Sequence, residues 1–240
     1  MIYCATLCFF TLPESIYFFY STMSMTEIKA IIFDMDGVIS DTQKLHALVE
    51  EEILRRYGVN LSPEEITQKY AGTTDREFFE KIFNDHNISV DVENIIKEKW
   101  ERMIKISKNN ISPISGAVEL IKNLRRNDFK LAIASASPHN FIKLVLEELN
   151  LKGKFDVIVS AEDVKFGKPN PEIFLLAVKK LRVKPEECII IEDGINGIIA
   201  GKKAGMKCIW FTKEENKTKV PADLIVNDLK ELTIAKIKGL

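Results

Sequence analysis

Short apolar runs alternate with amphipathic stretches along most of this chain, a pattern that predicts strands separated by helices. The first run, Ile31-Ile32-Phe33, ends abruptly in two acidic residues one position apart, Asp34 and Asp36. The two-residue period of a strand sends both carboxylates to the same side, just past its carboxyl end, where open α/β sheets bind ligands. The alternative is that these residues form an ordinary turn after the strand, in which aspartate and glycine are common.

Four helical patterns follow this run, with no convincing strand between them. The first three begin at candidate capping residues, Thr74 or Asp75 for the third, and the third and fourth have apolar positions at helical spacing. The four run from an N-cap at Asp41-Thr42 to about Tyr57, from Ser62 onward, from Arg76 to Asn84 and from about Val90 to Ser107. The pattern therefore predicts an all-helical unit over residues 41–110.

From Pro113 onward, helices and strands alternate with short links. Apolar β-branched runs predict strands at 130–135, 155–160, 188–191, 207–211 and 224–226, and amphipathic stretches predict helices at 116–126, 138–149, 171–181 and in the segment that ends near Gly205. Such alternation implies a parallel sheet covered by helices on both faces. We therefore expect an α/β core formed by residues 25–40 and 111–240, with the helical unit inserted after the first strand.

Composition narrows the possible partners. The chain has 240 residues, of which 46% are hydrophobic and 29% charged, so it can bury a real core. Its formal net charge of −1 gives no reason to expect binding to nucleic acid or to an anionic membrane. The four cysteines form no CxxC pair or Cys/His cluster, which suits a reducing, cytoplasmic setting.

The first 24 residues differ from the rest of the chain. Residues 1–24 contain one charged residue, Glu14, and no lysine or arginine, so the basic region of a signal peptide is missing. Pro13 interrupts the apolar run, and neither half reaches the roughly 20 residues of a membrane span. We expect a non-core extension before a domain that begins near Met25; a targeting or membrane-associating segment is the alternative.

Polar side chains lie at the carboxyl ends of several predicted strands, which a parallel sheet brings together. They are Asp34 with Asp36, Ser135 with Ser137, Lys168, and Glu192 with Asp193. The carboxylates make an oxygen-rich site for a hard cation, most plausibly Mg²⁺, and a serine hydroxyl and a lysine ammonium suit phosphate oxygens. Together they predict phosphoryl transfer.

The same residues resemble a known family. Asp34-x-Asp36-Gly37-Val38, Ser135, Gly167-Lys168-Pro169 and Glu192-Asp193 look like the four ordered motifs of the haloacid dehalogenase superfamily. The resemblance covers nearly everything from Ile28 onward and is greatest to the β-phosphoglucomutase and phosphoglycolate phosphatase subfamily, whose helical cap is inserted after the first motif. It implies a Rossmann-like core with an all-helical cap.

The resemblance also implies roles for the acidic residues. Asp34 would be the nucleophile that forms an aspartyl-phosphate, and Asp36 the general acid and base. Mg²⁺ would be held by the Asp34 carboxylate, the Asp36 backbone carbonyl and Asp193, with Glu192 in support. Ser135 and Lys168 would bind the transferring phosphoryl group. Gly37 would allow the backbone to turn tightly beside the ligand.

Other positions bear on the substrate. Thr42 and His46 match a DTxxxH signature that orients the acid/base in β-phosphoglucomutases, although His46 could simply face the cap hinge. The cap loop with Gly72 and Arg76 lacks the lysine by which such mutases contact the sugar phosphate. After Ser137 the chain has Pro138-His139 in place of the Lys-Asn pair that binds a second phosphate. A phosphatase is therefore favoured over a mutase.

Two more distant functions fit these residues less well. Dehalogenation needs no metal and no second acid, so Asp36 and Glu192-Asp193 argue against it. A non-catalytic binding module should have lost at least one motif residue, and none is lost. The prediction is a Mg²⁺-dependent phosphatase for a small phosphorylated metabolite, acting as a monomer.

Overall fold

The computed structural model describes residues 26–70, 73–213 and 220–240. The predicted extension over residues 1–24 and the predicted site residue Gly72 lie outside these ranges. Within them, six strands form one sheet in the order β3-β2-β1-β4-β5-β6, with every pair parallel. The strands are β1 (Ala30–Phe33), β2 (Lys130–Ser135), β3 (Val157–Ser160), β4 (Cys188–Glu192), β5 (Lys207–Phe211) and β6 (Leu224–Val226). The predicted α/β class is confirmed.

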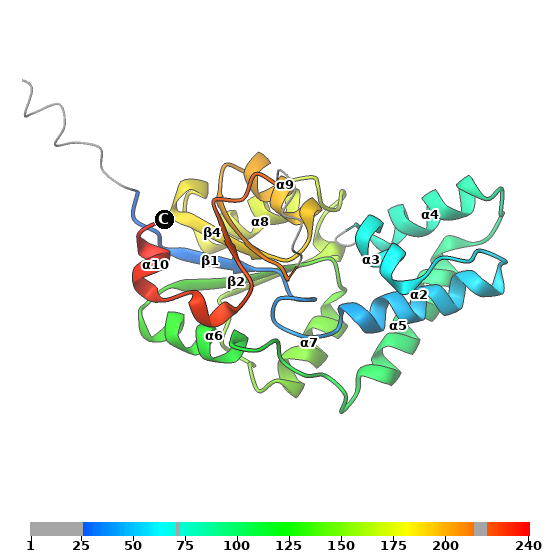
Figure 1. Cartoon of the computed structure of the whole chain (residues 1–240), viewed down its shortest axis with the longest axis horizontal. Coiled ribbons are helices and arrows are strands. Elements are labelled where there is room, and N and C mark those ends of the chain that lie inside the picture. The colour runs from blue at the N-terminus through cyan, green and yellow to red at the C-terminus, as the bar shows by residue number, and fades with distance from the viewer. Residues whose placement is uncertain (1–25, 71–72, 214–219) are drawn as a thin grey trace, which may run out of the picture.

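Helices cover both faces of the sheet, as the continuous apolar strands require (Figure 1). Successive β1 residues point to opposite faces: Ile31 and Phe33 join the core of one face, Ala30 and Ile32 that of the other. The first face is covered by α6 (Ala117–Arg126), α7 (His139–Glu148) and α10 (Ile234–Lys238), the second by α8 (Glu172–Leu181) and α9 (Ile195–Lys203). Central β1 is thereby buried on both sides, and its carboxyl end is held in a fixed place.

Four helices that follow β1 gather in a lobe beside the sheet, which we call the cap (Figure 1). They are α2 (Gln43–Arg56), α3 (Pro63–Tyr70), α4 (Asp75–Asp85) and α5 (Val92–Ser107). The apolar interior of the cap is continuous with the core of the first sheet face, and in it Phe79 stacks on Phe83 and meets Phe78 edge to face. Thr74 and Glu77 form a reciprocal capping box that starts α4, so of the two predicted capping residues, Thr74 and Asp75, the structure uses Thr74.

Some local predictions were wrong in detail. Thr42 occupies the N-cap position of α2, but its side chain makes no capping hydrogen bond, because its hydroxyl is bonded to Asp36 and Ser40 instead. The short α10 and three 3-10 turns were not predicted; each spans five residues or fewer, too little for a periodic pattern. No helix in the described ranges is long and apolar enough to cross a membrane.

Candidate active site

Lys168 links two of the predicted motifs by ion pairs at the end of the sheet. Its Nζ donates to Asp34 Oδ1 at 2.6 Å, to Glu192 Oε1 at 2.7 Å and to the carbonyl oxygen of Ala134 at 3.1 Å. These bonds use all three ammonium donors of a side chain that is 1% exposed. Burial lowers the pKa of Lys168, but the charges of Asp34 and Glu192 outweigh it and hold that pKa above its usual value. The ammonium is therefore a fixed positive charge beside Asp34.

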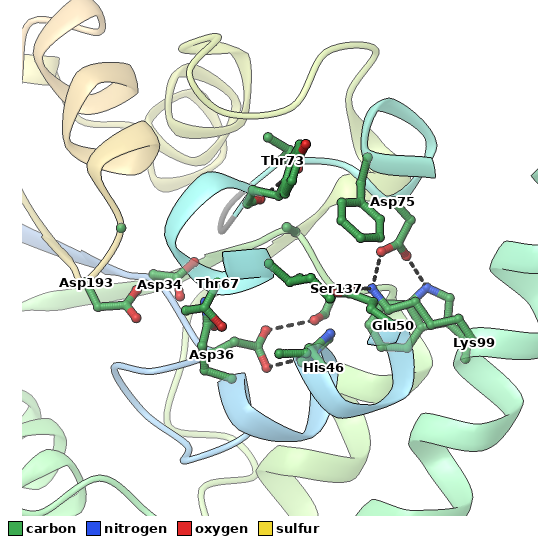
Figure 2. A pocket seen from close by; sticks show the side chains of 18 of the residues that line it. Asp34, Asp36, His46, Glu50, Thr67, Thr73, Asp75, Lys99, Ser137 and Asp193 are labelled. Carbon is green, nitrogen blue, oxygen red and sulfur yellow. Dashed lines mark hydrogen bonds and ion pairs between the residues drawn. The ribbon is translucent and has the colours of Figure 1, made fainter. Parts of the chain in front are cut away.

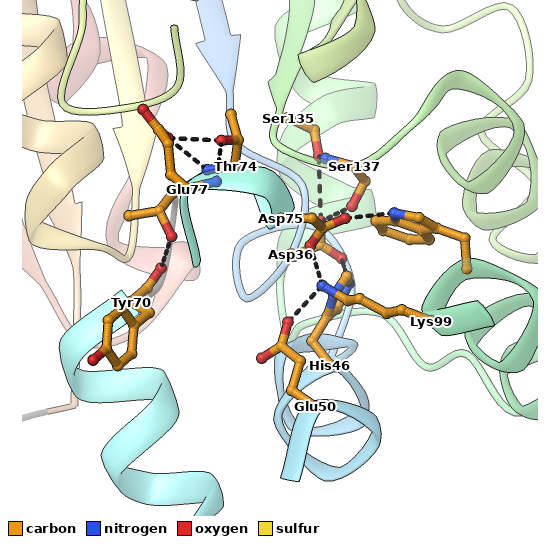
Figure 3. A network of polar contacts seen from close by, with 12 residues as sticks. Asp36, His46, Glu50, Tyr70, Thr74, Asp75, Glu77, Lys99, Ser135 and Ser137 are labelled. Carbon is orange, nitrogen blue, oxygen red and sulfur yellow. Dashed lines mark hydrogen bonds and ion pairs between the residues drawn. The ribbon is translucent and has the colours of Figure 1, made fainter. Parts of the chain in front are cut away.

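Asp36 accepts hydrogen bonds from four side chains, of which His46, Ser135 and Ser137 are seen in Figure 3. Its Oδ1 lies 2.5 Å from the Thr42 hydroxyl and 3.3 Å from His46 Nε2, and its Oδ2 lies 2.8 Å from Ser137 Oγ and 3.2 Å from Ser135 Oγ. Burial raises the pKa of Asp36, but the charge of His46 and the bonds from His46, Thr42 and Ser137 outweigh it and bring that pKa to about 2. The carboxylate is held in one orientation.

His46 itself is held by aromatic rings. It meets Trp100 and Phe141 edge to face, with ring centroids 5.3 and 5.6 Å away. Trp100 belongs to the cap and Phe141 to the core, so this imidazole lies where the two units meet. The structure thus brings both residues of the predicted Thr42–His46 pair to Asp36.

Three carboxylates crowd the neighbourhood of Lys168. Burial raises the pKa of Asp34 to about 8, with Glu192 and Asp36 adding to the effect against the opposing charge of Lys168. Burial, with the charges of Glu192 and Asp34, also raises the pKa of Asp193 well above its usual value. One ammonium does not neutralise this group, so the site is suited to a further cation.

The donor set can be tested against Mg²⁺. The described residues contain no group of three His, Cys, Asp or Glu side chains placed to hold a metal. Both Glu192 oxygens are already used, by Lys168 and by the backbone N–H of Gly194 at 2.7 Å. Asp34, Asp193 and the Asp36 carbonyl remain, an all-oxygen set that fits Mg²⁺ once waters complete its shell. Lys168 and the Gly194 N–H thus hold the Glu192 carboxylate in place.

Two glycines make room for these acids. A Cβ at Gly37, whose φ is +92°, would lie 2.1 Å from Asp193 Oδ2, and a Cβ at Gly197 would lie 1.7 Å from Glu192 Oε1. Asp193 is further held by its carbonyl oxygen, which accepts a 2.8 Å bond from Trp210 Nε1. At both glycines the backbone lies so close to an acidic side chain that a residue with a Cβ would not fit.

The cap forms the other wall of the cavity over Asp34 and Asp36 (Figure 2). Its polar lining consists of Gln43, His46, Glu50, Thr67, Tyr70, Thr73, Asp75, Lys99 and Trp100. Apart from His46, sequence reasoning missed these residues. One signal was available, because Lys99 lies between Ile95 and Met103 on the buried stripe of α5, an unusual place for a lysine.

One residue predicted to contact the substrate lies away from the cavity. Arg76, predicted to contact substrate, has a side chain that is 56% exposed and forms ion pairs with Glu80 and Glu93 on the outside of the cap. The structure does not bring it to the cavity.

The fold is a parallel sheet between helices, with an aspartate–lysine pair at the ends of its central strands and an inserted helical cap over that pair. This combination defines the class of capped Rossmann-like hydrolases. The family model described as haloacid dehalogenase-like hydrolase matches residues 31–211, and the chain belongs to this family. The predicted resemblance is thereby confirmed.

Individual relatives are similar over most of their length. Phosphorylated carbohydrates phosphatase of Thermotoga maritima is 32% identical over 76% of this chain and 84% of its own. Hexitol phosphatase B of Escherichia coli is 29% identical over 89% of this chain and 98% of its own. The crystal structure of β-phosphoglucomutase from Clostridium difficile superposes with a TM-score of 0.79 at 30% identity, covering 88% and 96% of the two chains.

Proposed function

We propose that this protein is a Mg²⁺-dependent phosphatase that hydrolyses a small phosphorylated metabolite through an aspartyl-phosphate on Asp34. The observation that carries the proposal is the pairing of Asp34 with Lys168 at 2.6 Å beside a second aspartate, Asp36, that is held by four hydrogen bonds. The names of the relatives, which are sugar-phosphate phosphatases, support hydrolysis as the reaction.

In the first step, the Asp34 carboxylate attacks phosphorus and the bond to the leaving oxygen breaks. Lys168 fixes the orientation of Asp34 through Oδ1 and offsets negative charge that develops on the phosphoryl group. The hydroxyls of Ser135 and Ser137 donate to Asp36 Oδ2. With substrate bound, they would donate to phosphate oxygens instead. Bound Mg²⁺ would supply the positive charge that lets a carboxylate approach a phosphate dianion.

Asp36 moves the proton in both steps. A dianionic phosphate beside it favours its protonated form, from which it protonates the leaving oxygen. The carboxylate that results then takes a proton from the water that attacks the aspartyl-phosphate, releasing phosphate and restoring Asp34. Hydrogen bonds from Thr42 and Ser137 and the charge of His46 favour the ionised form needed in this second step.

A phosphosugar mutase is the second candidate, favoured by the likeness to β-phosphoglucomutase. A mutase must retain a bisphosphate intermediate, which needs cations for a second phosphate. Of the described residues that line the cavity, Lys99 is the only lysine or arginine, and two carboxylates already hold it. We therefore favour the phosphatase.

The test is hydrolysis of p-nitrophenyl phosphate by the purified protein with and without Mg²⁺. We expect Mg²⁺-dependent release that falls at least about a thousandfold in Asp34→Asn, because the nucleophile is lost. Asp85→Asn, an exposed change in α4, is the matched control and should leave the rate unchanged. Release without Mg²⁺, or release undiminished in Asp34→Asn, would overturn the proposal. β-Glucose 1-phosphate with a trace of the bisphosphate then separates mutase from phosphatase.

A further inference from the structure

The cap wall that faces the catalytic aspartates contains a buried cluster of charges, formed by Glu50, Asp75, Lys99 and Trp100 (Figures 2 and 3). Lys99 Nζ donates to Glu50 Oε1 at 2.5 Å and forms an ion pair with Asp75, whose other oxygen accepts a bond of 2.5 Å from Trp100 Nε1. The Lys99 side chain is 2% exposed, and those of Glu50 and Asp75 are 11% and 15% exposed. Three helices, α2, α4 and α5, supply these residues. We call them the cap cluster.

The cap cluster carries a net negative charge. Burial lowers the pKa of Lys99, but Asp75 and Glu50 outweigh it and hold that pKa above its usual value, so the ammonium stays protonated. Two carboxylates and one ammonium leave a charge of about −1 in a poorly solvated wall. A substrate whose leaving group carries a carboxylate or a second phosphate would be repelled there.

The same wall is well suited to hydroxyl groups. Within the described part of the chain nothing donates to Glu50 Oε2, and Lys99 has one N–H beyond the two used for its carboxylate partners. Thr67 and Thr73 add hydroxyls to the lining. A hydroxyl both donates and accepts, so a polyhydroxylated group would satisfy carboxylate and ammonium together.

We propose that the cap cluster binds the hydroxyl groups of an uncharged leaving group, so that the substrate is the monophosphate ester of a neutral sugar or polyol. Glu50 and Asp75 act as specificity determinants: they accept from the hydroxyls and keep Lys99 from serving as an anion site. This inference rests on the proposed phosphatase function and narrows its substrate class.

The first experiment compares kcat/KM of the wild-type protein for four esters. Sorbitol 6-phosphate represents the neutral polyols, phosphoglycolate a leaving group with a carboxylate, fructose 1,6-bisphosphate one with a second phosphate, and p-nitrophenyl phosphate reports the chemical step. We expect the polyol ester to exceed both anionic esters by tenfold or more. Equal or better turnover of either anionic ester, with p-nitrophenyl phosphate hydrolysed, overturns this inference alone. No hydrolysis of any ester overturns the proposed function itself.

The second experiment changes the charge of the cap cluster with little change in its shape. Glu50→Gln and Asp75→Asn each remove one negative charge, so the ratio of kcat/KM for the polyol ester to that for phosphoglycolate should fall about tenfold. Glu52→Gln is the matched control, because Glu52 lies on the same helix but pairs with Arg102 on the outside. Thermal melting establishes that each variant is folded. An unchanged ratio in either folded variant would contradict the assignment.

Discussion

At the scale of single residues, the tightest constraint in the site is at Gly37. Its φ of +92° is one that side-chain-bearing residues rarely adopt, and a Cβ there would lie 2.1 Å from the Asp193 carboxylate. Gly58 has a similar φ of +79°, but a Cβ there would meet nothing within 4 Å. The two glycines therefore separate the cost of backbone strain from the cost of displacing an acid.

We predict that Gly37→Ala lowers kcat by at least about a hundredfold, because it forces Asp193 away from its place beside Asp34. Gly58→Ala should cost about 1 kcal/mol of stability through its φ and leave kcat unchanged. Steady-state kinetics and thermal melting of both variants provide the measurement. If both lose activity equally, or Gly37→Ala stays fully active, the close approach has no catalytic importance.

At the scale of helices and strands, most elements could be predicted because the periodicity and capping residues that indicate an element lie within its own stretch of sequence. The apolar run over residues 130–135 predicted the bounds of β2, and Thr74 was one of two residues predicted to cap α4. The site residues that follow strands were also predictable, since parallel strands bring their ends together. The cap cluster was not, because Glu50 and Lys99 lie 49 residues apart and only the packing of α2 against α5 joins them.

The cap and the core also contact each other at Gly167, a position that the hydrophobic periodicity of the sequence does not indicate. Gly167, which precedes Lys168, lies against the start of α4: a Cβ there would be 2.5 Å from Thr74 Cγ2 and 2.9 Å from the Thr74 backbone nitrogen. The loop that carries the ammonium therefore abuts the cap helix that carries Asp75 of the cap cluster. The position of α4 is linked to the position of Lys168.

We predict that Gly167→Ala lowers kcat/KM about tenfold or more, because the added methyl pushes α4 away from the Lys168 loop and opens the cavity. Thr74→Ser removes the methyl that would be struck first and keeps the capping hydroxyl, so the double variant should recover part of the loss. Kinetics of both single variants and the double variant, analysed as a cycle, measure this coupling. Strictly additive effects would mean that the contact does not transmit the displacement.

At the scale of the whole molecule, the charges needed for function oppose folding. Asp34, Glu192 and Asp193 are brought together at the end of the sheet with Lys168 as their shared cation, and the pKa of Asp193 is raised by burial and by the other two acids. An acid whose pKa is higher in the folded than in the unfolded chain lowers stability at neutral pH, because folding disfavours its charged form. The site should therefore lower the stability of the metal-free protein. A bound cation should restore that stability by reducing the repulsion among the carboxylates.

We predict that Asp193→Asn raises the Tm of the metal-free protein by about 2–4 °C, the shift expected for roughly 1 kcal/mol in a chain of this size. Mg²⁺ should raise the Tm of the wild-type protein by mass action and have little effect on the variant, which lacks one of the three ligands. Melting in EDTA and in Mg²⁺ measures both effects without any assay of turnover. Glu101→Gln, an exposed change that removes the same charge, is the control and should show neither effect. A variant that melts below the wild-type protein in EDTA would show that Asp193 is not a source of repulsion. A variant that keeps the full Mg²⁺ shift would show that Asp193 is not a metal ligand.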